Sequence, residues 1–209
     1  MVYDPQKHDR RSIRLRGYDY SQAGAYFVTI CTQNRACLFG EITGGKMILN
    51  DAGRMVEKWY HELSNKFPDI QCDEYVVMPD HFHCIIVNVG LRSGTEGECA
   101  RGGHTSGERA RGEHARGGHT SDERTRGEHA GSPLPGVVQW FKTMTTNEYI
   151  RGVKQWGWPR FDGKLWQRNY WDHIVRNEND LRRIRKYIID NPAKWGMGRD
   201  KNRGGRTLR

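Results

Sequence analysis

The sequence contains no apolar run that approaches the length of about 20 residues needed to cross a lipid bilayer. Residues 1–16 are polar and basic, and they lack the apolar centre that a secretory signal requires. These absences exclude a membrane-spanning chain and argue against secretion. We therefore expect no membrane partner and a cytoplasmic location.

Cysteine is also scarce, with five residues in 209 and no CxxC pair among them. An odd and scattered set argues against a disulfide framework and against a zinc site of the usual spacing. Cys31 and Cys84 lie inside apolar, strand-like runs, where a thiol acts as a small core side chain. This pattern is typical of a protein from a reducing compartment.

Acidic residues are too few to balance the basic ones, because 25 Asp and Glu stand against 34 Lys and Arg and leave a net charge of +9. Any single basic cluster can be explained as a solvated surface, but several together indicate a polyanionic partner, namely a nucleic acid. The clusters are Arg10, Arg11, Arg14 and Arg16, then Arg182, Arg183, Arg185 and Lys186, then Arg199, Lys201, Arg203, Arg206 and Arg209.

One segment is almost free of apolar side chains. RGGHTSGERARGEHA at 101–115 is followed directly by RGGHTSDERTRGEHA at 116–130, and alanine is the only apolar residue in either copy. Such a unit cannot bury enough surface to offset the entropy of ordering it. We predict a disordered insertion at 91–132, a basic flexible tail at 196–209, and a single domain formed by 1–90 and 133–195.

The remaining chain alternates between strand and helix patterns. β-branched, aromatic and apolar runs predict strands at 26–32, 74–78, 81–89 and 166–175. Apolar residues at helical spacing predict helices from Asn50 to about Pro68, from Leu134 to Ile150, and from Asn177 to a stop at Pro192. The order β-α-β-β-α-β plus a last helix is the α+β, ferredoxin-like split βαβ plan. It predicts an antiparallel sheet with two helices on one face and the C-terminal helix on the other.

Two histidines stand two residues apart in the strand-like run VVMPDHFHCIIV. Side chains alternate along a strand, so His81 and His83 are expected to face one way, while Phe82 packs beneath the two helices. Two imidazoles in this arrangement can coordinate one metal ion. An accidental or structural pair is the alternative.

A second set of polar groups lies on the last helix, in IRKYIIDNP. Tyr187 and Asn191 are four residues apart and therefore share one helix face. A tyrosine hydroxyl can attack a phosphodiester when a cation neutralises the phosphate, and an asparagine amide oxygen can serve as a metal ligand. A half-buried tyrosine beside Ile184 and Ile188 is the alternative.

The two sets together resemble the HUH single-strand transposases that use one tyrosine, and within them the REP-associated tyrosine transposases. The resemblance lies in DEYVVMPDHFHCIIV and LWQRNYWDHIVRNENDLRRIRKYIIDNPAKW, and RRSIRLRGYDYSQAGAYFVTICTQNR is similar as well. It covers residues 10 to 195 without the insertion. The ordered combination of motifs is more specific than either motif alone.

The resemblance implies a divalent ion, Mg²⁺ or Mn²⁺, bound by His81, His83 and Asn191, although relatives often carry glutamine as the third ligand. It implies that Tyr187 forms a 5′-phosphotyrosine with single-stranded DNA beside a hairpin, and that the protein is a homodimer. Contacts to the nucleic acid are expected from Arg14, Arg16, Arg176, Arg182, Arg183, Arg185 and Lys186.

Two rival functions remain open at this point. A non-catalytic nucleic-acid-binding module has the same fold and charge but no use for the His–Tyr set. A metal-dependent phosphoesterase uses water as nucleophile and makes Tyr187 dispensable. Several side chains of QRNYWDH and its surroundings are weaker candidates: Tyr170 as a second nucleophile, Asp172 and His173 near the metal or DNA, and Trp166 and Trp171 as base-stacking groups.

Overall fold

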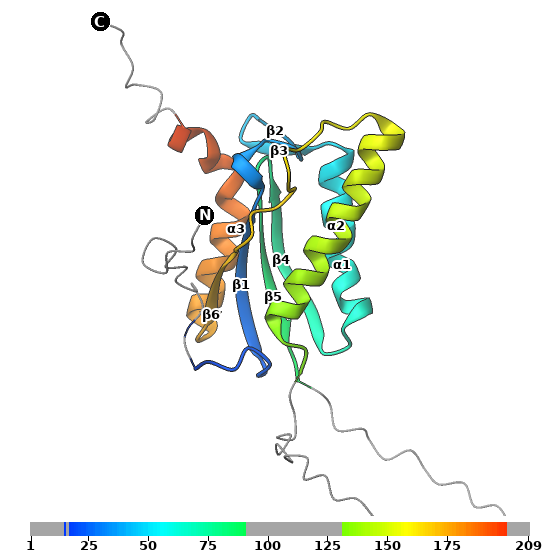
Figure 1. Ribbon diagram of the computed structural model, residues 1–209. Coiled ribbons are helices and arrows are strands. Elements are labelled where there is room, and N and C mark those ends of the chain that lie inside the picture. Colours follow the sequence, from blue (N-terminus) through cyan, green and yellow to red (C-terminus); the bar gives the residue numbers. More distant parts are fainter. Residues whose placement is uncertain (1–14, 16, 91–130, 200–209) are drawn as a thin grey trace, which may run out of the picture.

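The computed structural model describes residues 15, 17–90 and 131–199 (Figure 1). The predictions for Arg14 and Arg16, for the repeats at 101–130 and for residues 200–209 lie outside the described residues. Within them, no helix is both long and apolar enough to cross a membrane.

Four antiparallel strands form the main sheet: β1 (Gly24–Cys31), β4 (Ile70–Met78), β5 (His81–Asn88) and β6 (Trp171–Val175). Their order across the sheet is β4-β5-β1-β6, with β5 and β1 in the centre. Helices α1 (Asp51–Lys66) and α2 (Leu134–Trp156) cover one face, and α3 (Glu178–Arg199) lies on the other (Figure 1). The predicted α+β arrangement is therefore confirmed.

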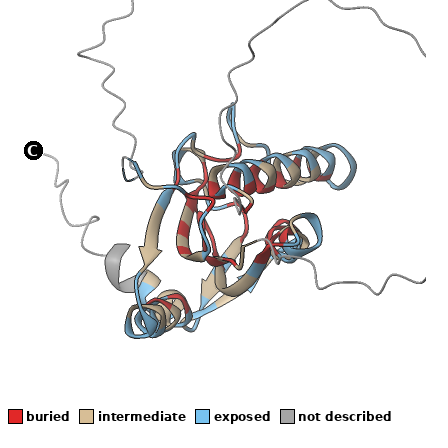
Figure 2. Ribbon diagram, turned by 90° about the horizontal axis from the view of Figure 1, so that it is seen from below, coloured by how far each residue is buried: buried red, intermediate tan, exposed pale blue. Residues whose placement is uncertain are grey.

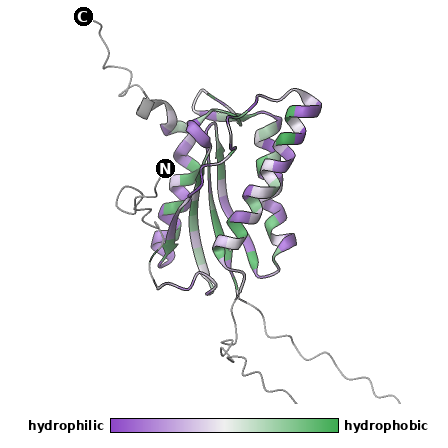
Figure 3. Ribbon diagram, in the orientation of Figure 1, coloured by the Kyte–Doolittle hydropathy of each residue, from purple (hydrophilic) through white to green (hydrophobic). Residues whose placement is uncertain are grey.

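Strand alternation divides the apolar side chains between two layers. The larger layer lies between the sheet and the α1–α2 pair and contains Val28, Phe82 and Phe141, as predicted for Phe82. A smaller cluster beneath α3 has Ile85, Ile184 and Ile188 as its buried members. In Figure 2 the buried residues concentrate on the sheet and on the helix sides that face it, and in Figure 3 hydrophobic residues follow the central strands while α3 is mostly hydrophilic.

Asparagine side chains cap the starts of two helices, at the positions where the sequence predicts that these helices begin. The side chain of Asn50 accepts a hydrogen bond from the Gly53 amide at 2.9 Å, and the side chain of Asn177 accepts one from the Asp180 amide at 2.9 Å. Each bond satisfies one of the amides that have no partner inside the first turn of a helix. The starts of α1 and α3 are therefore encoded locally.

Some predicted boundaries are wrong. A hairpin of β2 (Gly40–Thr43) and β3 (Lys46–Leu49) was not predicted, because strands of four residues carry little alternation. The predicted strand at 166–175 is regular only over β6, and Trp166 forms an isolated bridge with Thr32. Between Trp166 and β6, the backbone carbonyls of Gln167 and Arg168 accept hydrogen bonds from the Lys142 ammonium at 2.9 and 3.2 Å.

The prediction that Pro192 ends the last helix is also wrong, since α3 continues to Arg199. A proline inside a helix removes one backbone hydrogen bond, which is a cost that other contacts must offset. Trp195 supplies such a contact, because its ring lies 5.5 Å from the ring of His81 on the sheet. The first residues of the predicted flexible tail, 196–199, are accordingly helical.

Two glycines of α2 provide a matched test of how closely the chain packs. A methyl group on Gly152 would lie 2.3 Å from the ring of Trp158, whereas one on Gly136 would meet nothing within 4 Å. We expect Gly152→Ala to lower the free energy of unfolding by about 2 kcal/mol through overpacking. Gly136→Ala should raise it by up to about 1 kcal/mol through helix propensity. Urea unfolding monitored by circular dichroism measures both, and equal effects would contradict the close approach of Trp158.

Candidate active site

The two histidines open β5 and lie on the sheet face that is turned toward α3. Both are 5% exposed, and their Nε2 atoms are 3.0 Å apart. They share this face because Phe82 between them points into the larger core. The strand thus presents two imidazole nitrogens to one point.

The Nδ1 atom of each ring has a partner behind it. Nδ1 of His81 lies 2.6 Å from the Asp80 carboxylate, so it carries the proton and donates. Nδ1 of His83 lies 2.7 Å from the Thr29 hydroxyl, which can rotate to donate or to accept. When Thr29 accepts, Nδ1 of His83 carries the proton, as Nδ1 of His81 does, and the Nε2 atoms of both rings present lone pairs. Metal-bound histidines usually have their second nitrogen fixed in this way by a carboxylate or another acceptor.

Electrostatics keep His83 in the form that a metal requires. Burial, with smaller contributions from His81 and the cationic Arg35, lowers the pKa of His83 to about 3. The ring is therefore neutral at physiological pH, as ligand binding needs. Cis ligands of an octahedral ion at about 2.1 Å are about 3.0 Å apart, which matches the spacing of the two Nε2 atoms.

Tyr187 and Asn191 lie on α3 directly opposite the histidines. The Tyr187 ring packs 5.5 Å from that of His83 and 6.0 Å from that of Phe27, yet the side chain is 45% exposed. A depression of about 550 Å³ contains both residues together with both histidines, so the four predicted residues meet in one place. Its lining comprises Thr29, Arg35, Asp80, His81, His83, Tyr187, Asn191, Lys194 and Trp195.

The third protein ligand of a metal ion at this site would be an amide oxygen. Within the described residues, no group of three or more His, Cys, Asp or Glu side chains is placed to hold a metal ion. A site at His81 and His83 therefore needs Asn191, which lines the same depression, to complete a set of three protein ligands. Water and phosphate oxygens would then occupy the remaining positions.

Sequence reasoning missed several members of this site. Asp80 precedes His81 directly, and Trp195 continues the spacing of four that joins Tyr187 to Asn191, so both could have been found. Thr29 could not, because it meets His83 only through the pairing of β1 with β5. Arg35 reaches the depression from the turn after β1, and no local pattern marks it.

The four basic residues of α3 that were predicted to contact nucleic acid have acidic or polar partners. Arg185 donates to the Asp73 carboxylate on β4, with 2.9 Å from Nε to Oδ1. Arg182, Arg183 and Lys186 pair within α3, with Glu178, Asp180 and Asp190 respectively. Arg176 lines a separate depression with Arg183, His173, Asn177, Asn179 and Asp180. Their predicted contacts to nucleic acid remain predictions.

None of the weaker candidates lines the depression at the histidine pair. Tyr170 is buried beneath the Lys142 ammonium, which is 5.5 Å from its ring centre. Asp172 accepts a hydrogen bond from the Tyr20 hydroxyl at 2.7 Å. His173 Nε2 lies 2.8 Å from the Asp180 carboxylate, and this bond, followed by one from Arg183, lowers the pKa of Asp180 to about 2. Trp166 is buried in the core, whereas Trp171 is exposed.

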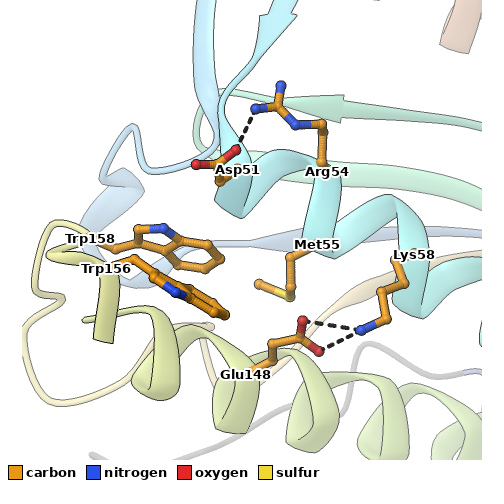
Figure 4. Close-up of a pocket in the computed structure, with 7 residues that line it drawn as sticks. All are labelled: Asp51, Arg54, Met55, Lys58, Glu148, Trp156 and Trp158. Carbon is orange, nitrogen blue, oxygen red and sulfur yellow. Dashed lines mark hydrogen bonds and ion pairs between the residues drawn. The ribbon is translucent and has the colours of Figure 1, made fainter. Parts of the chain in front are cut away.

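A depression of about 420 Å³ lies on the other side of the molecule, between α1 and α2 (Figure 4). Trp156, Trp158 and Met55 form its apolar part. Its charges are matched, because Arg54 pairs with Asp51 and Lys58 pairs with Glu148. It contains none of the predicted catalytic residues, and the depression at the histidine pair is therefore the candidate active site.

The ion pair between Arg185 and Asp73 gives a test of what holds α3 in place. We expect Arg185→Ala to lower the free energy of unfolding by up to about 1 kcal/mol, as for a well-oriented surface pair. Arg182→Ala, one turn away, should change it less, because Arg182 pairs only within the exposed surface of α3. Thermal and urea unfolding provide the measurement.

The effect of Arg185→Ala on the free energy of unfolding should depend on pH. Hydrogen bonding to Arg185 lowers the pKa of Asp73 below its ordinary value of 3.8. A carboxylate with a depressed pKa stabilises the fold above its unfolded pKa and loses that contribution as the pH falls through the folded pKa. The stability difference between wild type and Arg185→Ala should thus be constant from pH 5 to 7 and shrink below about pH 4. A difference that stays the same at pH 3 would exclude this pair as its source.

Comparison with known proteins places the chain among relatives. No protein-family model matches it. It is 32% identical over 196 residues to an uncharacterized protein of Haemophilus influenzae, covering 92% of this chain and 93% of that protein. It is 21% identical over 181 residues to a second protein of that organism, named "Putative REP-associated tyrosine transposase", covering 85% of this chain and 75% of that protein.

Two solved structures are more distant. One is a REP-associated tyrosine transposase bound to a REP hairpin, 18% identical with a TM-score of 0.47, covering 88% of this chain and 74% of that chain. The other is a "putative transposase" of Deinococcus radiodurans, 16% identical with a TM-score of 0.40, covering 86% and 96%. The family assignment rests on the sequence relatives. The chain belongs to the same family as the uncharacterized Haemophilus influenzae protein, which it matches over nearly its whole length. The expected relationship of the chain to the REP-associated tyrosine transposases is confirmed.

Proposed function

We propose that the chain is a metal-dependent transposase that cuts and rejoins single-stranded DNA through Tyr187. The observation that carries the proposal is the position of an exposed tyrosine in the same depression as two converging imidazole nitrogens. A purely binding module has no need for this combination. The relationship to the REP-associated tyrosine transposases supports the same chemistry.

His81, His83 and Asn191 would hold the divalent ion, which we propose to be Mg²⁺ or Mn²⁺. When bound there, it would offset the negative charge that develops on the scissile phosphate. Asp80 and Thr29 keep the two imidazoles in the orientation that ligation requires. The protein contributes a prearranged site, so little reorganisation is needed when DNA arrives.

Tyr187 would then attack the phosphorus. A bond forms between the phenolic oxygen and phosphorus, the bond from phosphorus to the 3′ oxygen breaks, and the leaving strand takes a proton as its 3′-OH. The phenolic proton passes to water, which reaches the half-exposed ring. Attack by another 3′-OH reverses these steps and rejoins the strands. The phosphodiester energy is kept in the 5′-phosphotyrosine, so no external energy source is needed.

The net charge and the family resemblance both support single-stranded DNA as the partner. A net charge of +9 suits a polyanion, and the family resemblance implies single-stranded DNA beside a hairpin, bound by a homodimer. Backbone contacts by the arginines would position the strand, while hairpin shape and unpaired bases would select it.

A covalent-adduct assay tests the proposal. The full chain is mixed with labelled single-stranded hairpin DNA from beside its own gene, together with Mg²⁺ or Mn²⁺, and resolved on a denaturing gel. We expect a slowly migrating adduct that EDTA abolishes and that falls at least a thousandfold in Tyr187→Phe, His81→Ala and His83→Ala. Tyr170→Phe is the matched control, because that tyrosine is buried away from the site, and it should retain the adduct.

The other outcomes separate the rival functions. Cleavage without any adduct, retained in Tyr187→Phe, would show a phosphoesterase that uses water. Tight binding with neither cleavage nor adduct across several hairpins would show a non-catalytic binding module. Loss of the adduct in Tyr170→Phe but not in Tyr187→Phe would move the nucleophile to Tyr170.

A further inference from the structure

The turn that follows β1 is unusual in its backbone. Asn34 and Arg35 both have left-handed φ angles, 57° and 54°, although neither is glycine. Asparagine adopts this conformation readily, but for Arg35 it costs about 1 kcal/mol or more and persists only where surrounding contacts enforce it. Strain of this kind at the rim of an active site calls for a functional explanation.

The enforcing contacts come from the site itself and from the loop before β6. The Thr32 amide donates to the Asp80 carbonyl at 3.0 Å, and the Gln33 amide donates to the Leu165 carbonyl at 2.9 Å. The Arg35 amide closes the turn on the Thr32 carbonyl at 3.2 Å. The strained turn is therefore fixed to the residue that precedes the histidine pair.

One result of this conformation is the position of the Arg35 side chain. Its Nε lies 3.3 Å from the Asp80 carboxylate, and its Nη1 lies 2.8 Å from Cys31 Sγ. Asp80 is buried and its other oxygen contacts His81, so one carboxylate joins Arg35 to a predicted metal ligand. Half of the Arg35 side chain is exposed, and it lines the depression that contains Tyr187.

The guanidinium keeps binding capacity toward solvent. An arginine has five N–H donors, and no described residue accepts a hydrogen bond from Nη2 of Arg35. The other cation in the depression, Lys194, is tied at 3.3 Å to Asp190 on its own helix. Arg35 is thus the cation that the fold holds rigidly beside the histidine pair.

We propose that Arg35 is a substrate-binding residue that grips a phosphate of the DNA strand lying over His81 and His83. The planar fork of a guanidinium matches two phosphate oxygens, and its fixed position means that little side-chain entropy is lost on binding. Holding this phosphate would orient the strand toward Tyr187. The proposal rests on single-stranded DNA being the substrate, but not on cleavage.

The test uses the full chain and a hairpin with a single-stranded tail. Arg35→Gly removes the side chain and its ion pair with Asp80, and at the same time relieves the left-handed backbone, which offsets part of the lost stability. Arg35→Ala removes the same side chain without that relief. Arg54→Ala is the charge control, because Arg54 is an exposed arginine that also pairs with an aspartate, but on α1, away from the site.

In EDTA, we expect Arg35→Gly to weaken binding roughly tenfold or more, and to reduce the slope of log K against log salt by about one. Arg54→Ala should change binding less than twofold. Arg35→Lys, which keeps the charge but loses the fork, should lie between Arg35→Gly and wild type. In Mg²⁺ or Mn²⁺, adduct formation by Arg35→Gly should slow by at least the same factor at subsaturating DNA.

Two results would overturn the inference. One is an Arg35→Gly variant with wild-type affinity and salt slope, even if the wild type forms the adduct. The other is an equal loss of affinity in Arg35→Gly and Arg54→Ala, which would show a general charge effect. If no adduct forms in any protein but Arg35→Gly still binds at least tenfold more weakly, the transposase proposal fails and the inference about Arg35 stands.

Discussion

The register between β1 and β5 is the constraint on which the candidate site depends. It pairs Thr29 with His83 and Cys31 with His81, so the hydroxyl that supports one imidazole comes from the neighbouring strand. A slip by one residue would turn every side chain of β5 to the other face. Both histidines would then point into the larger core, and Phe82 would face α3. The burial of Phe82, Cys84 and Ile86 on one face makes such a slip costly.

The two faces of the sheet differ in what packs on them. The larger core under α1 and α2 contains most of the buried apolar residues. The α3 face has a cluster of three buried isoleucines, one ion pair to β4 and the contact of Trp195 with His81. Ile184 and Ile188 flank Tyr187 in the sequence, so the residues that dock the helix also set the position of the tyrosine.

Much of this arrangement could be read from periodicity, because local rules govern it. Alternation along β5 predicted the shared face of His81 and His83, and helical spacing predicted that of Tyr187 and Asn191. Contacts across the sheet could not be predicted, because Thr29 and Arg35 reach the site only once β1, β5 and the turn after β1 have assembled. The length of α3 was underestimated for a similar reason, since a tertiary contact of Trp195 outweighs the local effect of Pro192.

The ends of the segment that carries the 15-residue repeats are fastened to each other. The backbone carbonyl of Asp69 accepts a hydrogen bond from the Val89 amide at 2.8 Å, and its carboxylate accepts one from the Ser132 hydroxyl at 2.7 Å. The side-chain amide of Asn88 donates to the Ser132 carbonyl at 3.2 Å. This clasp closes the domain where the chain leaves β5, about 23 Å along the strand from His81. The number of repeats is thereby uncoupled from the geometry of the histidine pair. A gene that gains or loses copies of the 45-nucleotide unit in frame changes the number of residues between these two ends, while the contacts that join the ends stay the same.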